Sequence, residues 1–263
     1  MNPLWSIVVG VAAYLVGSIS GARLITRVFA RGMPVPDETE LRLEGSDKVL
    51  VMKSVSATSV SANIGPRYGF MTFLFDVTKV FVPVLLFKQM LPGTQYYLIA
   101  ATTGIVGHIW PVYHGFKGGR GVASIYGAVF AIDWPAVLVT ALAGMLFGFA
   151  VLKDLYFTYM AGLWFLIPWL WWRTRDPYVV IFAVVVNVLF LVSSLSEARA
   201  WRKIKKEPVW NDPTEAWKIS AMGRGIIKLG TRLGLIKKKM PKSAAADPPV
   251  LKKPDPSTGG DST

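Results

Sequence analysis

Long apolar blocks, separated by short polar turns, run through most of the chain. They cover residues 4–24, 70–91, 96–113, 122–152, 155–172 and 178–195. A block of about 18 or more apolar residues can cross a hydrocarbon layer about 30 Å thick. The turn signal Asp133-Trp134-Pro135 divides the longest block into a short span and a full one. The pattern therefore predicts an all-α integral membrane fold with about seven transmembrane helices.

Lysine and arginine are unevenly spread over the turns. Basic short loops face the cytoplasm, and about half of the 29 Lys and Arg residues follow residue 195. With seven spans, the C-terminus is then cytoplasmic and the N-terminus outside. The same parity makes 25–69, 114–121 and 153–154 cytoplasmic and places the turns at 92–95 and Asp133 outside, with Arg173 and Arg175 as the exception. The first block could resemble a secretory signal, but it lacks a basic start and a cleavage site.

Composition divides the chain into three parts. Residues 1–198 form the predicted transmembrane domain, with its cytoplasmic loop at 25–69. Residues 199–242 are a basic juxtamembrane tail, which reads either as an amphipathic helix on anionic membrane lipid or as an ordinary positive-inside tail. Residues 243–263 are rich in Ala, Pro, Asp and Ser, a composition typical of disorder.

Charge and composition also exclude some functions. The net charge of +13 lies mostly beside the membrane spans, and no nucleic-acid module is recognisable, so we expect no nucleic-acid partner. The chain has no cysteine, which excludes thiol catalysis and disulfides. With only two histidines, the sequence predicts no metal site and no cofactor.

A glycine-rich stretch at 107–123 carries the most informative chemistry. Glycine allows backbone N–H groups to converge on an anion, and Lys117 and Arg120 flank such a nest at Gly118, Gly119 and Gly121. A helix starting at Val122 would add its positive end. The alternative is a flexible positive-inside turn. No Gly-Lys-Ser/Thr follows, so the spacing is not that of a Walker loop.

The same stretch resembles the hallmark of the acyl-phosphate-dependent glycerol-3-phosphate acyltransferases of bacterial membranes, G-H-x-x-P-V-F-x-x-F-K-G-G-K-G-V-A. Arg120 replaces the family lysine. Tyr14–Ile19 is similar to the first-helix motif of the family, and Asp76 and Lys79 are similar to a second-helix motif. Matching positions in the hallmark are Gly107, His108, Pro111, Val112, Phe116, Lys117, Gly118, Gly119, Gly121, Val122 and Ala123.

A further family loop, G-S-G-N-x-G-A-T-N followed by an arginine, is altered. One alignment uses Ser46 for its start and Thr58 and Ser59 for its end, with about ten inserted residues between them. A gap-free count from Asp76 instead puts Met52 at the serine and Ala62 at the arginine. Arg67 is a candidate for the missing positive charge. Both alignments stay open.

The resemblance implies transfer of a fatty acyl group from acyl phosphate to the 1-hydroxyl of glycerol 3-phosphate, which gives lysophosphatidate for phospholipid synthesis. It implies that Arg120 and Lys117 bind phosphate and stabilise the departing charge, with Arg120 counted as catalytic. The three glycines would add backbone donors, and Ser46, Thr58, Ser59 and Arg67 are further phosphate-binding candidates. His108 could accept the hydroxyl proton, or it could be an ordinary histidine at a helix end. A bacterial inner membrane location follows, and a soluble enzyme that delivers acyl phosphate is a partner left open.

Two further interpretations concern the spans. Asp76 and Lys79 lie three residues apart on one helix face, which favours a structural ion pair over a part of the site. Gly17, Ser18 and Gly21 favour close helix packing. A non-catalytic binding or assembly protein that keeps the fold is the alternative function, and a solute transporter is a third.

Overall fold

The computed structural model describes residues 1–42, 49–148 and 155–205, together with residues 225, 228, 231 and 232. Ser46, the turn at 153–154 and nearly all of the tail beyond residue 205 lie outside the described residues. The described helices are α1 (Pro3–Gly17), α2 (Gly21–Phe29), α3 (Ala57–Asn63), α4 (Pro66–Met90), α5 (Tyr96–Ile109), the 3₁₀ turn η1 (Val112–His114), α6 (Val122–Ile132), α7 (Trp134–Phe147), α8 (Leu155–Thr174) and α9 (Pro177–Lys205).

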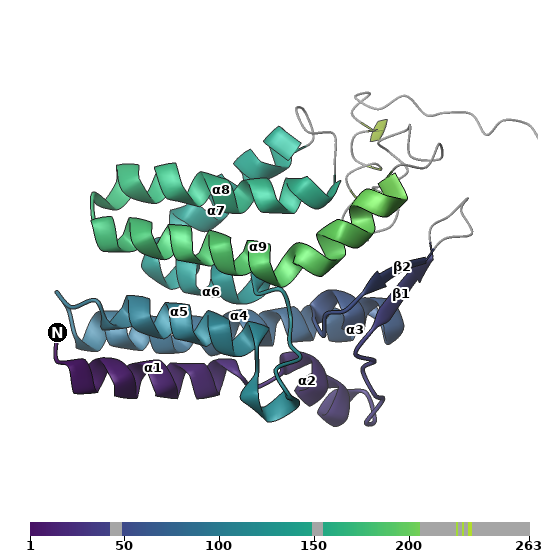
Figure 1. Cartoon of the computed structure of the whole chain (residues 1–263), viewed down its shortest axis with the longest axis horizontal. Helices are drawn as coiled ribbons and strands as arrows, with labels where there is room; N and C mark the ends of the chain where they lie inside the picture. Colours follow the sequence, from purple (N-terminus) through teal and green to yellow (C-terminus); the bar gives the residue numbers. More distant parts are fainter. Residues whose placement is uncertain (43–48, 149–154, 206–224, 226–227, 229–230, 233–263) are drawn as a thin grey trace, which may run out of the picture.

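The long helices lie side by side and run between two ends of the molecule (Figure 1). Hydrogen bonds between the turns show which of them lie at the same end of the molecule as the N-terminus. The amide of Asn2 donates to the hydroxyl of Tyr96, and Gln95 donates to Asp176. Lys88 donates to the last carbonyls of α6, those of Ala131 and Ile132. The N-terminus and the turns near 91–95, 133 and 175–176 therefore lie together.

Arg173, one of the two exceptions to the charge distribution, lies at this same end. Its guanidinium is 3.5 Å from one carboxylate oxygen of Asp133, and the other oxygen accepts a hydrogen bond from the indole of Trp169. Arg175 lies over the ring of Trp171. Both arginines thus have local partners. The predicted break at Asp133 is confirmed, because α6 ends at Ile132 and α7 begins at Trp134.

The first apolar block is not one helix. It breaks at residues 18–20, and α1 and α2 meet at a bend of 43°. Ser20 caps α2, since its hydroxyl accepts a hydrogen bond from the amide of Arg23. Within the described residues, α4 and the 177–200 part of α9 are long and apolar enough to cross a membrane, and α1 with α2 would be a third, broken span.

Small residues bring α1 close to α5. A Cβ atom added at Gly17 would clash with the carbonyl oxygen of Gly104, and one added at Gly107 would clash with the carbonyl oxygen of Tyr14. At Gly21, an added Cβ would lie 2.7 Å from a carboxylate oxygen of Asp76. The predicted close packing through Gly17 and Gly21 is therefore confirmed, and it places the α1–α2 break against α4 and α5.

The cytoplasmic loop predicted at 25–69 contains strands, so the prediction of an all-α chain needs correction here. Strand β1 (Thr39–Arg42) pairs antiparallel with β2 (Val49–Met52), with Thr39 opposite Met52. The β-branched and other apolar residues of Val49–Met52 favour an extended conformation. The hairpin projects from the end opposite to the N-terminus (Figure 1). It is a local addition to a helical fold.

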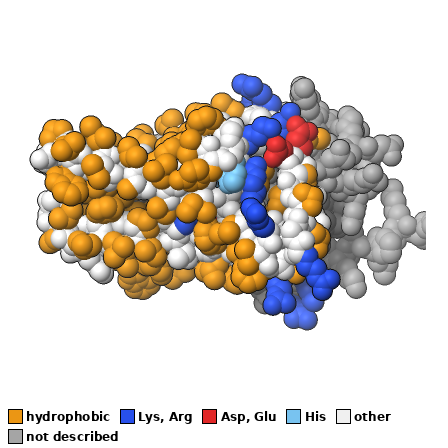
Figure 2. Space-filling view, turned by 90° about the horizontal axis from the view of Figure 1, so that it is seen from below, with side chains coloured by type: hydrophobic (Ala, Val, Ile, Leu, Met, Phe, Trp, Pro, Cys, Tyr) orange, Lys and Arg blue, Asp and Glu red, His pale blue; other side chains and the backbone are white. Residues whose placement is uncertain are grey.

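The largest buried cluster lies between α4, α5, α6, α8 and α9, and includes Ile105, Ile125, Leu166 and Val186. The outer surface of the helices is also apolar. Figure 2 shows hydrophobic side chains over the N-terminal end of one face, while Lys and Arg gather toward the other end. Large exposed apolar patches on a protein mark an interaction surface or membrane contact. The molecule thus has an apolar body and one basic end.

Candidate functional site

A cavity opens where the α1–α2 break meets α4, α5 and the glycine-rich loop. About 200 Å³ of empty space lies between its walls, and this value includes open solvent. Its walls come from four distant parts of the sequence, so only the folded chain forms it. The lining residues are Gly17, Ser18, Ile19, Ser20, Gly21, Val55, Asp76, Lys79, His108, Pro111, Gly118 and Gly119.

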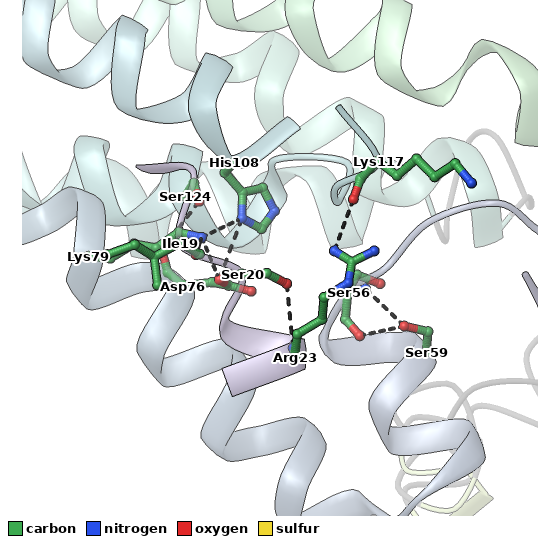
Figure 3. Close-up of polar contacts among 10 residues, drawn as sticks. All are labelled: Ile19, Ser20, Arg23, Ser56, Ser59, Asp76, Lys79, His108, Lys117 and Ser124. Atoms are coloured by element: carbon green, nitrogen blue, oxygen red, sulfur yellow. Dashed lines mark hydrogen bonds and ion pairs between the residues drawn. The ribbon is translucent and has the colours of Figure 1, made fainter. Parts of the chain in front are cut away.

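Three ionisable side chains meet in the cavity wall (Figure 3). The ammonium of Lys79 lies 2.8 Å from a carboxylate oxygen of Asp76 and 3.0 Å from Nδ1 of His108. Lys79 and Asp76 are each only 3% exposed. The predicted ion pair is confirmed, and both of its members also line the cavity. The two readings of Asp76 and Lys79, as ion pair and as part of the site, are therefore compatible.

The helix break supplies a further partner for Lys79. A carbonyl group freed from helical bonding needs another donor when it is buried. The carbonyl of Ile19, in the break, accepts a hydrogen bond of 2.7 Å from the Lys79 ammonium. Ser18 stabilises the same segment, because its hydroxyl donates to the carbonyl of Tyr14. The break is thus built into the cavity wall.

The glycine-rich loop packs directly on His108. The amide of Gly119 donates to the carbonyl of His108 at 3.2 Å, so this N–H group is already engaged. A Cβ atom at Gly119 would clash with Nε2 of His108, and one at Gly118 would clash with the His108 carbonyl. Glycine is required at both positions by this close approach. Gly121, with φ of 90°, is the N-cap of α6, which begins at Val122 as predicted.

Lys117 lies at the rim of the loop and points away from His108 (Figure 3). Its ammonium is 2.9 Å from a carboxylate oxygen of Asp37, whose other oxygen lies 3.1 Å from the guanidinium of Arg23. Arg23 also donates to the carbonyl of Lys117. The hydrogen bond from Lys117 lowers the pKa of Asp37, and the charges of Lys117 and Arg23 add to this effect. We call Arg23, Asp37 and Lys117 the rim cluster.

Arg120 points to a different partner. Its guanidinium is 3.0 Å from a carboxylate oxygen of Glu197 in α9, whose side chain is only 6% exposed. The hydroxyl of Ser193 donates to the backbone carbonyl of Arg120. Arg120 therefore ties the glycine-rich loop to the last helix. It is not among the residues that line the cavity.

The altered loop contributes Val55 to the cavity wall, through a segment that the sequence analysis did not identify. The amide of Val55 donates to the carbonyl of Gly118, and the buried hydroxyl oxygen of Ser54 has no hydrogen-bond partner among the described residues. The segment directly follows β2 and precedes α3. Both alignments of the altered loop stay open.

The remaining predicted residues lie away from the cavity. Ser59 is buried at the start of α3, where its hydroxyl accepts from the amide of Ser56 and donates to the carbonyl of the same residue. Thr58 and Arg67 are exposed, and neither lines the cavity. Ser46 lies outside the described residues. In the described part of the chain, no group of three or more His, Asp or Glu side chains is arranged to hold a metal ion.

Sequence reasoning missed Arg23, Ser54 and Glu197. A signal existed for Arg23, since a serine before Gly21 is a helix-cap signal that predicts a new helix with this arginine in its first turn. Glu197 was visible as a carboxylate two residues after the last apolar block, 178–195. Its pairing with Arg120, however, joins residues that are far apart in the chain, and no sequence pattern reveals such a contact.

Comparison with known proteins identifies the family to which the chain is similar. Residues 7–203 match the family described as glycerol-3-phosphate acyltransferase. The chain is 34% identical over 183 residues to the glycerol-3-phosphate acyltransferase of Methylococcus capsulatus, a match that covers 68% of this chain and 81% of the relative. It is 32% identical over 203 residues to that of Enterobacter sp., with 75% and 90% covered. A match to the Desulfotalea psychrophila protein, at 37% identity, covers 49% of this chain and 60% of the relative.

Two solved structures share the fold. Both are crystal structures of PlsY, an integral membrane glycerol 3-phosphate acyltransferase. The glycerol 3-phosphate form has a TM-score of 0.64 at 22% identity, and the match covers 77% of this chain and 94% of PlsY. The lysophosphatidic acid form has a TM-score of 0.62 at 23% identity, with the same coverage. The helical arrangement described above is therefore one that an integral membrane protein adopts.

Proposed function

Because the chain belongs to the glycerol-3-phosphate acyltransferase family, as its motifs predicted, we propose that it acylates the 1-hydroxyl of glycerol 3-phosphate with acyl phosphate as donor. The products are lysophosphatidate and inorganic phosphate. The lysophosphatidate then serves phospholipid synthesis in the inner membrane of a bacterium.

The observation that carries this proposal is the cavity beneath the glycine-rich loop. It lies between an apolar helix body and a basic end, and it is lined by Lys79, His108 and two glycines of the family hallmark. A donor with a fatty chain and a phosphate head needs both environments. Acyl phosphate is already activated, so the protein has mainly to orient the reactants and stabilise negative charge.

The rim cluster and the glycine-rich loop are the proposed phosphate-binding groups. Lys117 and Arg23 already hold one carboxylate between them, that of Asp37. A substrate phosphate would replace this carboxylate and bind both cations, and a guanidinium can bind it in two-pronged fashion. The positive charge expected from Arg67 is thereby assigned to Arg23. Arg120 acts by holding the loop in place through Glu197.

We also propose a topology. Helices α1, α4, α5, α6, α7, α8 and α9 would be the seven crossings, with the N-terminus outside and the cavity end in the cytoplasm. Three observations support it: the N-terminus shares one end with the turns near 92–95 and 133, the hairpin projects from the other end, and the exposed surface between the ends is apolar. The cytoplasmic end carries the rim cluster, where glycerol 3-phosphate is available.

A phosphate-release assay tests the proposal. The purified full-length protein in lipid nanodiscs is given palmitoyl phosphate with and without glycerol 3-phosphate, and with palmitoyl-CoA as the alternative donor. We expect phosphate release and lysophosphatidate only when acyl phosphate and glycerol 3-phosphate are both present. Binding of glycerol 3-phosphate without turnover would instead favour a non-catalytic binding protein. Lysophosphatidate formed from glycerol 3-phosphate with palmitoyl-CoA as the sole donor would contradict the proposal that acyl phosphate is the donor.

A further inference from the structure

The ammonium group of Lys79 has three close neighbours, one in an ion pair and two in hydrogen bonds. An ammonium offers three N–H donors and no acceptor. Its three neighbours are the Asp76 carboxylate at 2.8 Å, the Ile19 carbonyl at 2.7 Å and Nδ1 of His108 at 3.0 Å. The carboxylate and the carbonyl can only accept. The contact to His108 is a hydrogen bond if the Lys79 ammonium donates and Nδ1 accepts.

This contact determines where the ring proton of His108 lies. A neutral imidazole has one N–H and one bare nitrogen. If Nδ1 accepts from Lys79, the proton is on Nε2. The other tautomer would place an Nδ1–H group against an ammonium hydrogen, which is repulsive. Protonation of both nitrogens would add a second positive charge 3.0 Å from Lys79 in a buried site. The geometry therefore favours the neutral ring with Nε2–H.

The Nε2 edge of His108 lies against Gly119 in the cavity wall. The residue lines the cavity wall together with Gly119, and Nε2 makes no hydrogen bond to any residue within 1–42, 49–148 and 155–205. Only a glycine at position 119 leaves room beside it, because an added Cβ would clash with this nitrogen. The N–H group is thus oriented by a fixed partner on one side and unoccupied on the other.

We propose that His108 acts as a hydrogen-bond donor to a negatively charged oxygen of the acyl phosphate, with Asp76 and Lys79 as positioning residues that hold its tautomer. This replaces the earlier expectation that His108 accepts the proton of the hydroxyl. It rests on the proposed acyltransferase function for the identity of the acceptor. The tautomer itself does not depend on turnover.

The reaction balances without a base at His108. The 1-hydroxyl oxygen of glycerol 3-phosphate forms a bond to the acyl carbon, and the bond from that carbon to the phosphate oxygen breaks. The departing phosphate takes the hydroxyl proton and leaves as hydrogen phosphate. The Nε2–H group stabilises the negative charge that develops, which is the kind of contact worth most in a site that excludes water.

The tautomer can be measured directly, because the chain has only two histidines. A His114→Gln variant, labelled with ¹⁵N-histidine and free of substrate, would give the signals of His108 alone. We expect Nε2 protonated and Nδ1 bare at neutral pH. In Lys79→Met, we expect the proton to move to Nδ1, where the Asp76 carboxylate, 3.5 Å away, is the remaining acceptor. Protonated Nδ1 in His114→Gln would overturn the proposal.

Two substitutions test the use of the N–H group. The amide of glutamine can donate from about the position of Nε2 but cannot act as a base. We expect His108→Gln to keep phosphate release within about tenfold of His114→Gln, and His108→Leu to lose about a hundredfold or more, as on removal of one oxyanion donor. Equal loss in both variants, with unchanged thermal unfolding, would support a base and overturn the proposal. Absence of activity in His114→Gln with the expected tautomer would count against the proposed function instead.

Discussion

Two clusters at the site join lysine to aspartate at nearly the same distance but in different surroundings. Lys79 and Asp76 are 2.8 Å apart and each 3% exposed, whereas Lys117 and Asp37 are 2.9 Å apart and 67% and 47% exposed. In water, an exposed ion pair contributes about 0–1 kcal/mol. A buried pair is different, because removal of one partner leaves a charge without compensation. Distance alone therefore says little about the role of an ion pair.

The difference suggests separate tasks for the two clusters. Each member of the buried cluster has a fixed partner, so the cluster can hold His108 in one orientation. The rim cluster is open to water, and its cations can exchange the Asp37 carboxylate for a substrate phosphate at small cost. One cluster is suited to positioning and the other to binding. Asp76→Asn and Asp37→Asn test this distinction, and Arg120→Ala tests the ion pair that ties the glycine-rich loop to α9.

The largest effect is expected for Asp76→Asn. The change leaves the Lys79 ammonium buried without its carboxylate, which typically costs about 3–5 kcal/mol. We expect a matching fall in the free energy of unfolding, measured by denaturant titration in detergent. The same substitution at the rim, Asp37→Asn, is the matched control, and a change within about 0.5 kcal/mol is expected there. Equal losses at the two positions would remove the distinction between the clusters.

A smaller effect on stability, but a clear one on activity, is expected for Arg120→Ala. The change leaves Glu197 buried without its partner and releases the glycine-rich loop from α9. We expect the unfolding free energy to fall by about 1–3 kcal/mol and phosphate release to be abolished. Arg120→Lys restores the family residue and keeps a cation near Glu197, so it should retain most activity. Loss of activity in Arg120→Lys equal to that in Arg120→Ala would show that more than the ion pair is required.

The smallest effect is expected for Asp37→Asn in the assay. Removal of the competing carboxylate frees Lys117 and Arg23, so the KM for glycerol 3-phosphate should fall several-fold while kcat stays unchanged. Glu38→Gln, which removes an exposed carboxylate paired with Lys53 instead, is the control. A rise in KM for Asp37→Asn would mean that Asp37 orients the two cations rather than competing for them.

The pH dependence of this effect follows from the pKa of Asp37. The pKa is lowered in the folded protein from its usual value of 3.8, so the contribution of the carboxylate to stability is present above that value. It is lost only as the pH falls through the lower folded pKa. At neutral and mildly acidic pH the carboxylate therefore stays charged, and the KM difference between the wild type and Asp37→Asn should be constant there.

The sequence predicted the helical body well, because long apolar blocks leave few alternatives in a membrane. The turn at Asp133 and the ion pair of Asp76 and Lys79 were also predicted correctly, since both depend on neighbouring residues. The hairpin of β1 and β2 was not predicted, because each strand has only four residues and Thr39–Arg42 is mostly polar.

The site was predicted less completely, for a physical reason. The hallmark identified His108 and the glycines, but a motif does not show what its side chains contact. The phosphate-binding role expected of Arg120 and the base role expected of His108 stay predictions. In the structure Arg120 contacts Glu197, and Nδ1 of His108 lies against Lys79. Both contacts join parts of the chain that are distant in sequence.

The bend between α1 and α2 also has a consequence for biosynthesis. The carbonyl of Ile19 is hydrogen-bonded by Lys79, which leaves the ribosome sixty residues later. Until α4 arrives, this backbone group lacks the donor that it has in the folded protein, and a buried carbonyl without a donor is costly. The N-terminal segment therefore cannot acquire its final shape when it first enters the membrane. Its bend is completed only when the second long helix is inserted beside it, so that the first part of the site to be synthesised is among the last to be fixed.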